Sequence, residues 1–422
     1  MQVKISFYPR VLNNVSHHQT KKKSERAKLK RACFLYYMTF NNSALLYREA
    51  KALQKRGFIV DIIGLRSSKT EKIIQIFDGL KIYGIQSRPC AEKNVQLYFV
   101  RLLLFSIKAT LFLTLMNFIK KYRLIHVTAP PDFMVFTAFI PKMLGTKIIL
   151  DIHDISPELF MEKLHLPHDR KIVEWLKRVE RISCQFADHV ITVTEMWRKK
   201  LVARSVSGNK CTILLNVPAE NLFKVFPAKW KNQSNGFRLF YHGSLEEHFG
   251  VDTLLHAMPM IRKYIPNAQL YIYGGGRLKD KFLHIIADMC MQQYTHIYDK
   301  VPFYQLPELL CQADVGIVPT KDSQFSDDTI SMKSLEYMSL GIPIVISATT
   351  AHRYYFNDSM VIFFQPEDKD ELARAVIALH EKKHDQHKLI ENSRLFLKSH
   401  GWQNHKQIYL DIVERLMSNG RM

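Results

Sequence analysis

Short, almost wholly apolar runs alternate with amphipathic segments along residues 32–218. Residues 33–38 (CFLYYM) predict a buried strand, and residues 44–57, which follow the N-capping group Asn-Asn-Ser and end at Gly57, predict an amphipathic helix. The next strand is expected at 58–65, and such near-continuous apolar strands are typical of a parallel sheet covered on both faces. Further strands are expected at 80–85, 123–129, 147–153, 189–194 and 211–216, with helices that include 131–144 and 172–186.

A second alternating series follows the polar, irregular segment 223–236, which we interpret as a linker. Its strands are expected at 238–243, 268–274, 296–301, 314–319, 342–347 and 360–365, and the chain ends in helices at 369–382, 385–398 and 402–418. We therefore predict an α/β protein with two doubly wound, Rossmann-like parallel-sheet domains that face each other across a cleft. The expected divisions are a basic, flexible extension (1–31), a first domain (32–222), the linker (223–236), a second domain (237–398) and a C-terminal helix that packs back on the first domain (399–422).

The apolar segment 98–123 has the length of a membrane span, but Arg101 and Lys108 interrupt it. Its uninterrupted part, 109–119, is shorter than the ~20 residues that a bilayer requires. It also stands between two predicted strands of one sheet. Three interpretations stay open: a helix packed on the sheet, the same helix with its outer face on an anionic membrane, and a true span.

The charge composition limits the classes of partner that we expect. The 422 residues carry 60 Lys and Arg against 39 Asp and Glu, a net charge of +21, and part of this excess crowds residues 21–31. Such charge favours an anionic partner, either a phosphate-bearing substrate or a membrane. No aromatic and basic platform for nucleic acid is evident, so we expect no nucleic-acid partner.

Cysteine usage indicates the compartment. The six cysteines are scattered and form no C-x-x-C pair, so neither a zinc site nor a disulfide framework is expected. The first thirty residues also lack an apolar run of signal-peptide length. We expect a cytoplasmic protein, at the inner face of the membrane if the apolar helix contacts lipid.

The segment 327–346 (DDTISMKSLEYMSLGIPIVI) carries the clearest chemistry. A helix is expected to begin near Ser331, and its first-turn N–H groups can hold a diphosphate beside Lys333. Glu336 can accept hydrogen bonds from a ribose diol, and Asp328 on the preceding loop can contact a sugar. The alternative is that Asp327 and Asp328 only cap the helix and Glu336 is a surface acid.

Several segments resemble family 4 of the glycosyltransferases, which are retaining enzymes of the GT-B fold. The resemblance covers nearly all of the chain from about residue 32. It is carried by the order and spacing of 48–60 (REAKALQKRGFIV), 130–136 (PPDFMVF), 149–159 (ILDIHDISPEL), 213–218 (ILLNVP), 241–245 (YHGSL), 273–276 (YGGG), 301–319 (VPFYQLPELLCQADVGIVP) and the acid-x7-acid segment followed by GIPIV.

The resemblance implies that the second domain binds a nucleoside-diphosphate sugar, of UDP or GDP type, and that the first binds a glycan or lipid-linked acceptor. No cofactor and no metal are expected. His153 is implied to lie near the reacting sugar, although a loop histidine without a ligand is the alternative. The expected site residues are His153 and Asp328 for catalysis; Gly243, Ser244, Gly274, Gly276, Arg277, Thr329, Ser331, Lys333 and Glu336 for the donor; and Asn42, Ser43, Asp154, Glu158 and Asn216 for the acceptor side or the space between the domains.

Two departures from the family pattern stand out. The first acid of the family's Glu-x7-Glu pair is an aspartate here, either Asp328 or, in a shifted register, Asp327. The family's phosphate-binding Arg and Lys in a G-R-L-x-x-x-K-G pattern are replaced by Ser244 and Phe249. Either another cation, Lys333 or Arg277, compensates for them, or the activity is weak.

The predicted function is that of a retaining hexosyltransferase in cell-surface polysaccharide or glycolipid synthesis. Two alternatives stay open: a non-hydrolysing nucleotide-sugar epimerase of the same fold, and a catalytically impaired nucleotide-binding protein. An epimerase would act on the donor without an acceptor.

Overall fold

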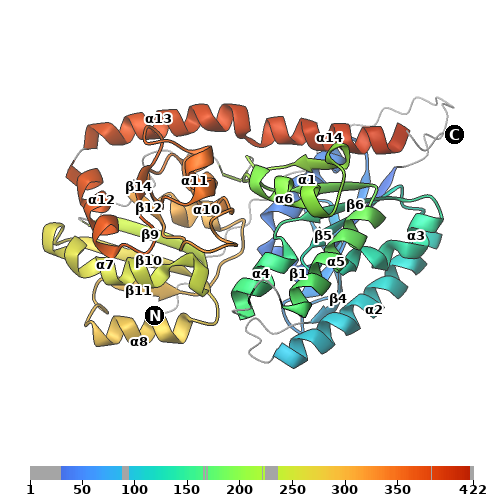
Figure 1. Ribbon diagram of the computed structural model, residues 1–422, viewed down its shortest axis with the longest axis horizontal. Coiled ribbons are helices and arrows are strands. Elements are labelled where there is room, and N and C mark those ends of the chain that lie inside the picture. The colour runs from blue at the N-terminus through green and yellow to red at the C-terminus, as the bar shows by residue number, and fades with distance from the viewer. Residues whose placement is uncertain are drawn as a thin grey trace, which may run out of the picture.

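The computed structural model describes residues 30–87, 95–164, 167, 170–220, 222–223, 236–381 and 383–418. The expected basic extension and linker therefore lie largely outside the described residues. Two sheets organise the rest, one in each domain, and Figure 1 shows the domains side by side.

The first sheet has eight strands in the order β3-β4-β2-β1-β5-β6-β7-β8, all parallel except the edge strand β3. The order reverses between β1 and β5, which are paired neighbours. Its strands are β1 (Arg31–Thr39), β2 (Ile59–Arg66), β3 (Ile74–Phe77), β4 (Leu80–Ser87), β5 (Leu124–Ala129), β6 (Lys147–Ile152), β7 (His189–Thr192) and β8 (Cys211–Ile213). The helices around it are η1 (Phe40–Asn42), α1 (Ala44–Lys55), α2 (Val95–Lys120), η2 (Asp132–Ala138), α3 (Phe139–Met143), α4 (Ser156–Leu164), α5 (Lys171–Phe186), α6 (Glu195–Arg204) and η3 (Gly208–Lys210).

The second sheet has six strands in the order β11-β10-β9-β12-β13-β14, and every pairing is parallel. Its strands are β9 (Phe237–Ser244), β10 (Ala268–Gly275), β11 (Thr295–Tyr298), β12 (Val315–Val318), β13 (Ile344–Ser347) and β14 (Ile362–Phe364). The helices are η5 (Glu247–Phe249), α7 (Val251–Tyr264), α8 (Lys279–Asp288), α9 (Leu306–Leu310), α10 (Met332–Leu340), α11 (Thr350–Tyr355) and α12 (Lys369–Glu381). Doubly wound sheets bind ligands where the strand order reverses, here between β9 and β12.

The expected helix at 131–144 is wrong in its type. Residues 132–138 form the tighter η2, and only 139–143 form an α-helical turn, α3. Pro141 has no N–H to donate to the carbonyl of Thr137, and its ring crowds that carbonyl, so one continuous α-helix cannot form. The short antiparallel strand β3 was not expected.

The helices α13 (Lys383–His400) and α14 (Trp402–Ser418) run along the whole molecule, and α14 lies over the first domain (Figure 1). Tyr409, Leu410 and Val413 of α14 are buried in a core that also contains the buried face of α1. The domains also meet directly, because the N–H of Phe303 donates to the carbonyl of Asn41 at 3.2 Å. The C-terminal segment thus belongs to both domains.

Candidate active site

The carboxyl end of β9 and the first turn of α10 meet where the second sheet reverses its order. Gly243 has a φ of 121°, and a Cβ there would lie 2.7 Å from Cε of Lys333. Glycine is required at this point because any side chain would displace the lysine. Lys333 stands in the first turn of α10 and is only 7% exposed. A cation and the free N–H groups of a helix N-terminus therefore converge beside β9.

Lys333 rests on aromatic rings. Its Nζ lies 3.9 Å from the ring centre of Phe249 and 5.3 Å from that of Tyr241. The negative faces of such rings stabilise an ammonium group that has lost contact with water. Burial nevertheless lowers the pKa of Lys333 to about 8. The resemblance expects a lysine at position 249. Phe249 stands there instead, and its ring contacts the ammonium group of Lys333.

Glu336 lies one turn further into α10 and is 2% exposed. Burial raises its pKa to about 8, against the opposing charge of Lys333. Its Oε2 is 3.3 Å from Nε2 of His242. Neither atom is aligned for a hydrogen bond, and Oε2 of Glu336 and Oγ of Ser331 are buried without a hydrogen-bond partner among the described residues. Buried polar atoms rarely lack a partner, so these two atoms mark the place as a candidate site for a polar ligand.

The neighbouring acids Asp327 and Asp328 have different environments. The carboxylate of Asp327 accepts from the N–H of Thr350 at 2.7 Å, at the beginning of α11. Asp328 instead forms an ion pair with Lys200 of α6, and its carbonyl accepts from the hydroxyl of Thr194 at 3.2 Å. Asp327 is therefore engaged within its own domain, whereas Asp328 lies between the two domains.

A cavity of about 710 Å³ opens at this junction. Its first-domain wall includes Glu158, Lys177 and Lys200, and its second-domain wall includes Asp322 and Asp328. Charged groups of both signs line it, which suits a ligand rich in hydroxyl groups.

His153 follows β6 at the facing edge of the first sheet. Its Nε2 lies 2.7 Å from Oδ2 of Asp151, and Nε2 of His126 lies 3.1 Å from the same oxygen. Burial acts to lower the pKa of His153, but the charge and hydrogen bond of Asp151 outweigh it, and the pKa is raised. Asp151 therefore holds His153 in one orientation and favours its charged form.

This pair belongs to a buried network that reaches α14. Nδ1 of His126 lies 3.1 Å from the hydroxyl of Tyr409, and Oε2 of Glu49 lies 3.6 Å from Nε2 of His126. The ligand atoms of Glu49, His126 and Asp151 lie within 4.8 Å of one another, close enough to hold a metal ion. Both ring nitrogens of His126 already have protein partners and Arg48 pairs with Glu49 at 3.4 Å, so we interpret the group as structural.

The other expected acceptor-side residues are dispersed. Glu158 lines the cavity but is held by the guanidinium of Arg204. Asn216 follows β8, and its Oδ1 is buried without a hydrogen-bond partner among the described atoms. Ser43 caps α1 by accepting from the N–H of Leu46 at 3.4 Å. Asn42 ends η1, and Asp154 follows His153 after β6.

The Gly-rich turn after β10 has a packing role. A Cβ on Gly274 would lie 2.2 Å from the carbonyl oxygen of Gly243, and one on Gly276 would lie 2.4 Å from that of Leu245. Arg277 pairs with Glu246 at 2.8 Å, and its side chain is 58% exposed. Ser244 ends β9 beside this turn. Of the two cations expected as compensation, Lys333 is buried beside Gly243, and Arg277 is neutralised at the surface.

Sequence reasoning did not single out Lys200, His242, His126 or Tyr409. His242 lies within the segment 241–245, but its type alone gave no reason to choose it. The other three have partners that are distant in the chain: Tyr409 and His126 are 283 positions apart. Thr329, which was expected to bind the donor, donates its hydroxyl to the carbonyl of Phe325 at 2.8 Å.

Two family models match the chain. The model described as Glycosyltransferase Family 4 matches residues 43–217, and the one described as Glycosyl transferases group 1 matches residues 223–396. A curated relative, the chitobiosyldiphosphodolichol beta-mannosyltransferase of Candida glabrata, is 21% identical over 328 residues, which cover 70% of this chain and 71% of the relative.

Solved structures agree in fold. A sucrose-phosphate synthase from Thermosynechococcus elongatus has a TM-score of 0.75 at 15% identity, covering 92% of this chain and all of that one. HepE from Anabaena, in complex with UDP and glucose, has a TM-score of 0.69 at 14% identity over the same shares. The solved structures and the two parallel-sheet domains show the GT-B fold. The two family models, which together span residues 43–396 with a short gap, show that the chain belongs to the family 4 glycosyltransferases.

Proposed function

We propose that this glycosyltransferase takes its sugar from a nucleoside-diphosphate sugar held at the N-terminus of α10. The observation that carries the proposal is the arrangement of Lys333, Glu336 and Ser331 beside Gly243. It offers a cation and helix N–H groups for a diphosphate, and a carboxylate for a ribose diol. The binding of UDP by HepE supports a uridine nucleotide as the first donor to test.

The sugar would then lie toward Asp328 and His153, with the acceptor hydroxyl in the cavity between the domains. Asp328 would bind sugar hydroxyls and offset the positive charge that develops at the anomeric carbon. His153, oriented by Asp151, would bind a sugar hydroxyl from the opposite side. In a retaining transfer the leaving phosphate itself receives the acceptor proton, and Lys333 stabilises that phosphate. Neither a metal nor a cofactor is required by this proposal.

A thermal-shift screen of UDP-, GDP- and ADP-sugars tests donor binding, because a ligand that binds only the folded state raises the melting temperature. Wild type should respond to one nucleotide family, and Glu336→Gln should respond less. An equal response of the two proteins would overturn the ribose role. Transfer is then measured as nucleotide release with an acceptor, and the anomeric configuration of the product decides retention. Epimerisation of the donor alone, without an acceptor, would instead support the epimerase.

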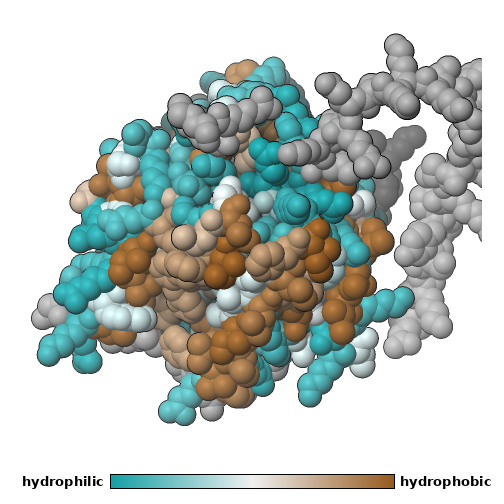
Figure 2. Space-filling view, turned by 90° about the vertical axis from the view of Figure 1, so that its right-hand side faces the viewer, coloured by the Kyte–Doolittle hydropathy of each residue, from teal (hydrophilic) through white to brown (hydrophobic). Residues whose placement is uncertain are grey.

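We also propose that the enzyme works at the cytoplasmic face of a membrane, on a lipid-linked acceptor in glycolipid or surface-polysaccharide synthesis. By length and composition α2 could cross a membrane, but one face of it, with Leu102, Phe105 and Leu113, is buried against the first domain. The opposite face is exposed: Leu111 is 68% and Ile119 68% accessible. Figure 2 shows apolar residues gathered on the end of the molecule that carries α2 and α3.

Two further observations support the membrane proposal. The exposed apolar face ends at the cationic residues Lys121 and Arg123, which suit anionic headgroups. The name of the Candida relative describes a mannosyltransferase that acts on a diphosphodolichol, a lipid-linked substrate. The described cysteines are free, as in a reducing compartment.

A further inference from the structure

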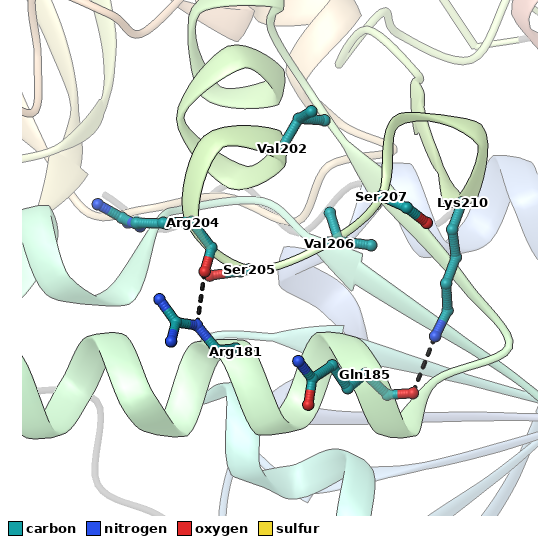
Figure 3. A pocket seen from close by; sticks show the side chains of 8 residues that line it. All are labelled: Arg181, Gln185, Val202, Arg204, Ser205, Val206, Ser207 and Lys210. Atoms are coloured by element: carbon teal, nitrogen blue, oxygen red, sulfur yellow. Dashed lines mark hydrogen bonds between the residues drawn. The ribbon is translucent and has the colours of Figure 1, made fainter.

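A second cavity of about 550 Å³ lies on the first domain (Figure 3), and Arg204 separates it from the cavity between the domains, since this residue lines both. It is formed by the C-terminal half of α5 and by the chain that leads from α6 to β8. Arg181 and Lys210 border it on opposite sides, and in the view of Figure 3 Val206 and Gln185 lie between them. The cavity is therefore a recess with a cation at each end.

Uncharged backbone carbonyls orient both cationic side chains. Nε of Arg181 donates to the carbonyl of Arg204 at 2.6 Å, and Nζ of Lys210 donates to the carbonyl of Gln185 at 2.8 Å. These carbonyls fix the position of each side chain but do not neutralise its charge. The side chain of Arg204 is oriented away from the recess, where two glutamates bind it. Two positive charges thus remain for an anionic ligand.

The surroundings add to the positive potential. The pKa of Lys210 is lowered by burial and by the charge of Lys142 on α3, and Asp188 and Cys184 oppose these effects without outweighing them. Asp188 itself is engaged elsewhere, because its carboxylate binds Lys142 at 3.0 Å and the N–H of Ile148 at 2.7 Å. An anion in the recess would relieve the repulsion between the neighbouring lysines.

The recess borders the exposed apolar face. Phe186, next to Gln185, stacks on Phe139 of α3 with 6.2 Å between ring centres, and Nζ of Lys142 lies 5.1 Å from the centre of its ring. Phe139 and Met143 of the short helix α3 are 51% and 73% exposed, and Leu144, which follows the helix, is 57% exposed. These side chains continue the apolar surface of α2 (Figure 2), which α3 contacts.

We propose that this recess binds the phosphate of an anionic membrane lipid whose acyl chains lie along α2 and α3. Arg181 supplies a planar fork that matches two phosphate oxygens, and Lys210 supplies a point charge at the other end. A soluble phosphate compound could bind to Arg181 and Lys210 without any apolar contact. The adjoining apolar surface favours a lipid, because it offers the acyl chains a place beside the bound headgroup. This inference rests on the membrane contact proposed above and adds to it a defined headgroup site.

The test measures flotation of the purified protein with phosphatidylcholine vesicles, with and without phosphatidylglycerol. The variant Arg181→Gln/Lys210→Gln removes the site. Its matched control, Lys171→Gln/Arg178→Gln, removes the same charge from exposed positions of the same helix outside the recess. We expect the site variant to lose binding to the anionic vesicles by on the order of tenfold, and the control to lose less.

Replacing chloride by inorganic phosphate at constant ionic strength separates a specific site from diffuse attraction, which depends on ionic strength alone. Phosphate should displace wild type and the control from anionic vesicles, and it should leave the residual binding of the site variant unchanged. Equal binding and equal phosphate sensitivity of the two double variants would overturn the proposal. Binding of inorganic phosphate to the recess without any effect of the site variant on flotation would assign it to a soluble anion and also overturn the lipid.

A third variant shows whether a negative result overturns only the headgroup site or the membrane contact as a whole. Leu111→Ser/Leu115→Ser makes the exposed face of α2 polar without entering the core, since both side chains are more than half exposed. If it floats as wild type does, the membrane contact itself is wrong, and the headgroup site is wrong with it. If it loses flotation while the site variant does not, only the headgroup site is wrong. Neither result bears on sugar transfer, which is assayed separately with a soluble acceptor.

Discussion

At the scale of single residues, the candidate donor site places a cation from α10 over an aromatic ring. Phe249 replaces a lysine of the family pattern, and Lys333 reaches over its ring from α10 with 3.9 Å between Nζ and the ring centre. Gly243 permits this path because it has no side chain. A missing cation in the motif therefore does not imply a missing charge in the site.

We expect Lys333→Met to weaken UDP binding about ten- to a hundredfold, because a buried charge-assisted hydrogen bond contributes roughly 1.5–3 kcal/mol. Isothermal titration calorimetry measures the change. The matched control is Arg277→Met, which removes an exposed cation already paired with Glu246 and should change the affinity by less than about twofold. The double variant Phe249→Lys/Lys333→Met should restore much of the affinity. If the double variant does not regain affinity, Lys333 does not act in place of the lysine that the family pattern has at position 249.

The affinity for UDP should be greatest near pH 8. Burial raises the pKa of Glu336 to about 8, so at lower pH the carboxyl gains a proton and loses its value as an acceptor for the ribose. Burial lowers the pKa of Lys333 to about 8, so at higher pH the cation is lost. In Glu336→Gln the decrease toward low pH should disappear and the decrease above pH 8 should persist. A profile of Glu336→Gln that matches wild type would refute this assignment.

Replacing Asp327 or Asp328 by asparagine should affect different properties of the enzyme. Asp328→Asn should lower the turnover about a hundredfold or more with little change in donor affinity, because its charge acts on the transition state. Asp327→Asn should instead lower the unfolding free energy by about 1 kcal/mol, since its carboxylate binds the first turn of α11. Steady-state kinetics and urea denaturation of both variants check this. The opposite assignment of effects would place the sugar-contacting acid at 327.

At the scale of elements, local sequence predicted most of the strands and helices but not how some of them end or pack. The buried strands and amphipathic helices follow from patterns of period 2 and 3.6, and nearly all lie within a few residues of the expected ranges. The strand β3 has only four residues, and its side chains are partly exposed, so its pattern is too weak to identify. In the helix expected at 131–144 only residues 139–143 are α-helical, and 132–138 form a tighter helix, because Pro141 has no N–H to donate to the carbonyl of Thr137.

The helix α14 is fixed to the first domain by polar contacts within an apolar core. The guanidinium of Arg48 lies 4.5 Å from the ring of Trp402, and the hydroxyl of Tyr409 meets His126. His126 shares Asp151 with His153, so three successive hydrogen bonds connect Tyr409 of α14 to the candidate catalytic histidine.

Tyr409→Phe should lower the unfolding free energy by about 1–3 kcal/mol, because it leaves a buried nitrogen of His126 without a partner. Urea denaturation measures the loss, and Tyr264→Phe, on a ring that is 57% exposed, should change the stability by less than about 0.5 kcal/mol. The pH profile of transfer should also shift in Tyr409→Phe if the network positions His153. A stability loss with an unshifted profile would limit Tyr409 to a structural role.

At the scale of the whole molecule, a strongly basic chain and an exposed apolar face occur together. The net charge of +21 attracts anionic surfaces from a distance, and the side chains of α2 and α3 can enter the lipid interface at contact. The donor site and this face lie on different parts of the molecule, so membrane contact need not block the cleft between the domains.

Binding to anionic vesicles should fall as sodium chloride rises from about 0.1 to 0.5 M, because the screening length shortens over this range. The binding that remains at high salt should depend on the apolar face. Co-sedimentation of wild type and Leu111→Ser/Leu115→Ser across the salt series tests both parts. Salt-independent binding, or residual binding that survives the two serines, would contradict the division into charge and apolar contact.

The sequence alone determined the two-domain α/β architecture and singled out residues 327–346 as the candidate donor segment. Strand periodicity, the helix start near Ser331 and the spacing of Asp328 and Glu336 are local properties of the chain. Only the tertiary structure showed which cation lies at the candidate donor site, because Lys333, Gly243 and Phe249 come from three separate segments that folding brings together. The tertiary structure also showed the hydrogen bond between Tyr409 of α14 and His126, and the cationic recess beside the apolar face. Those depend on contacts between residues far apart in the chain, which no local pattern encodes.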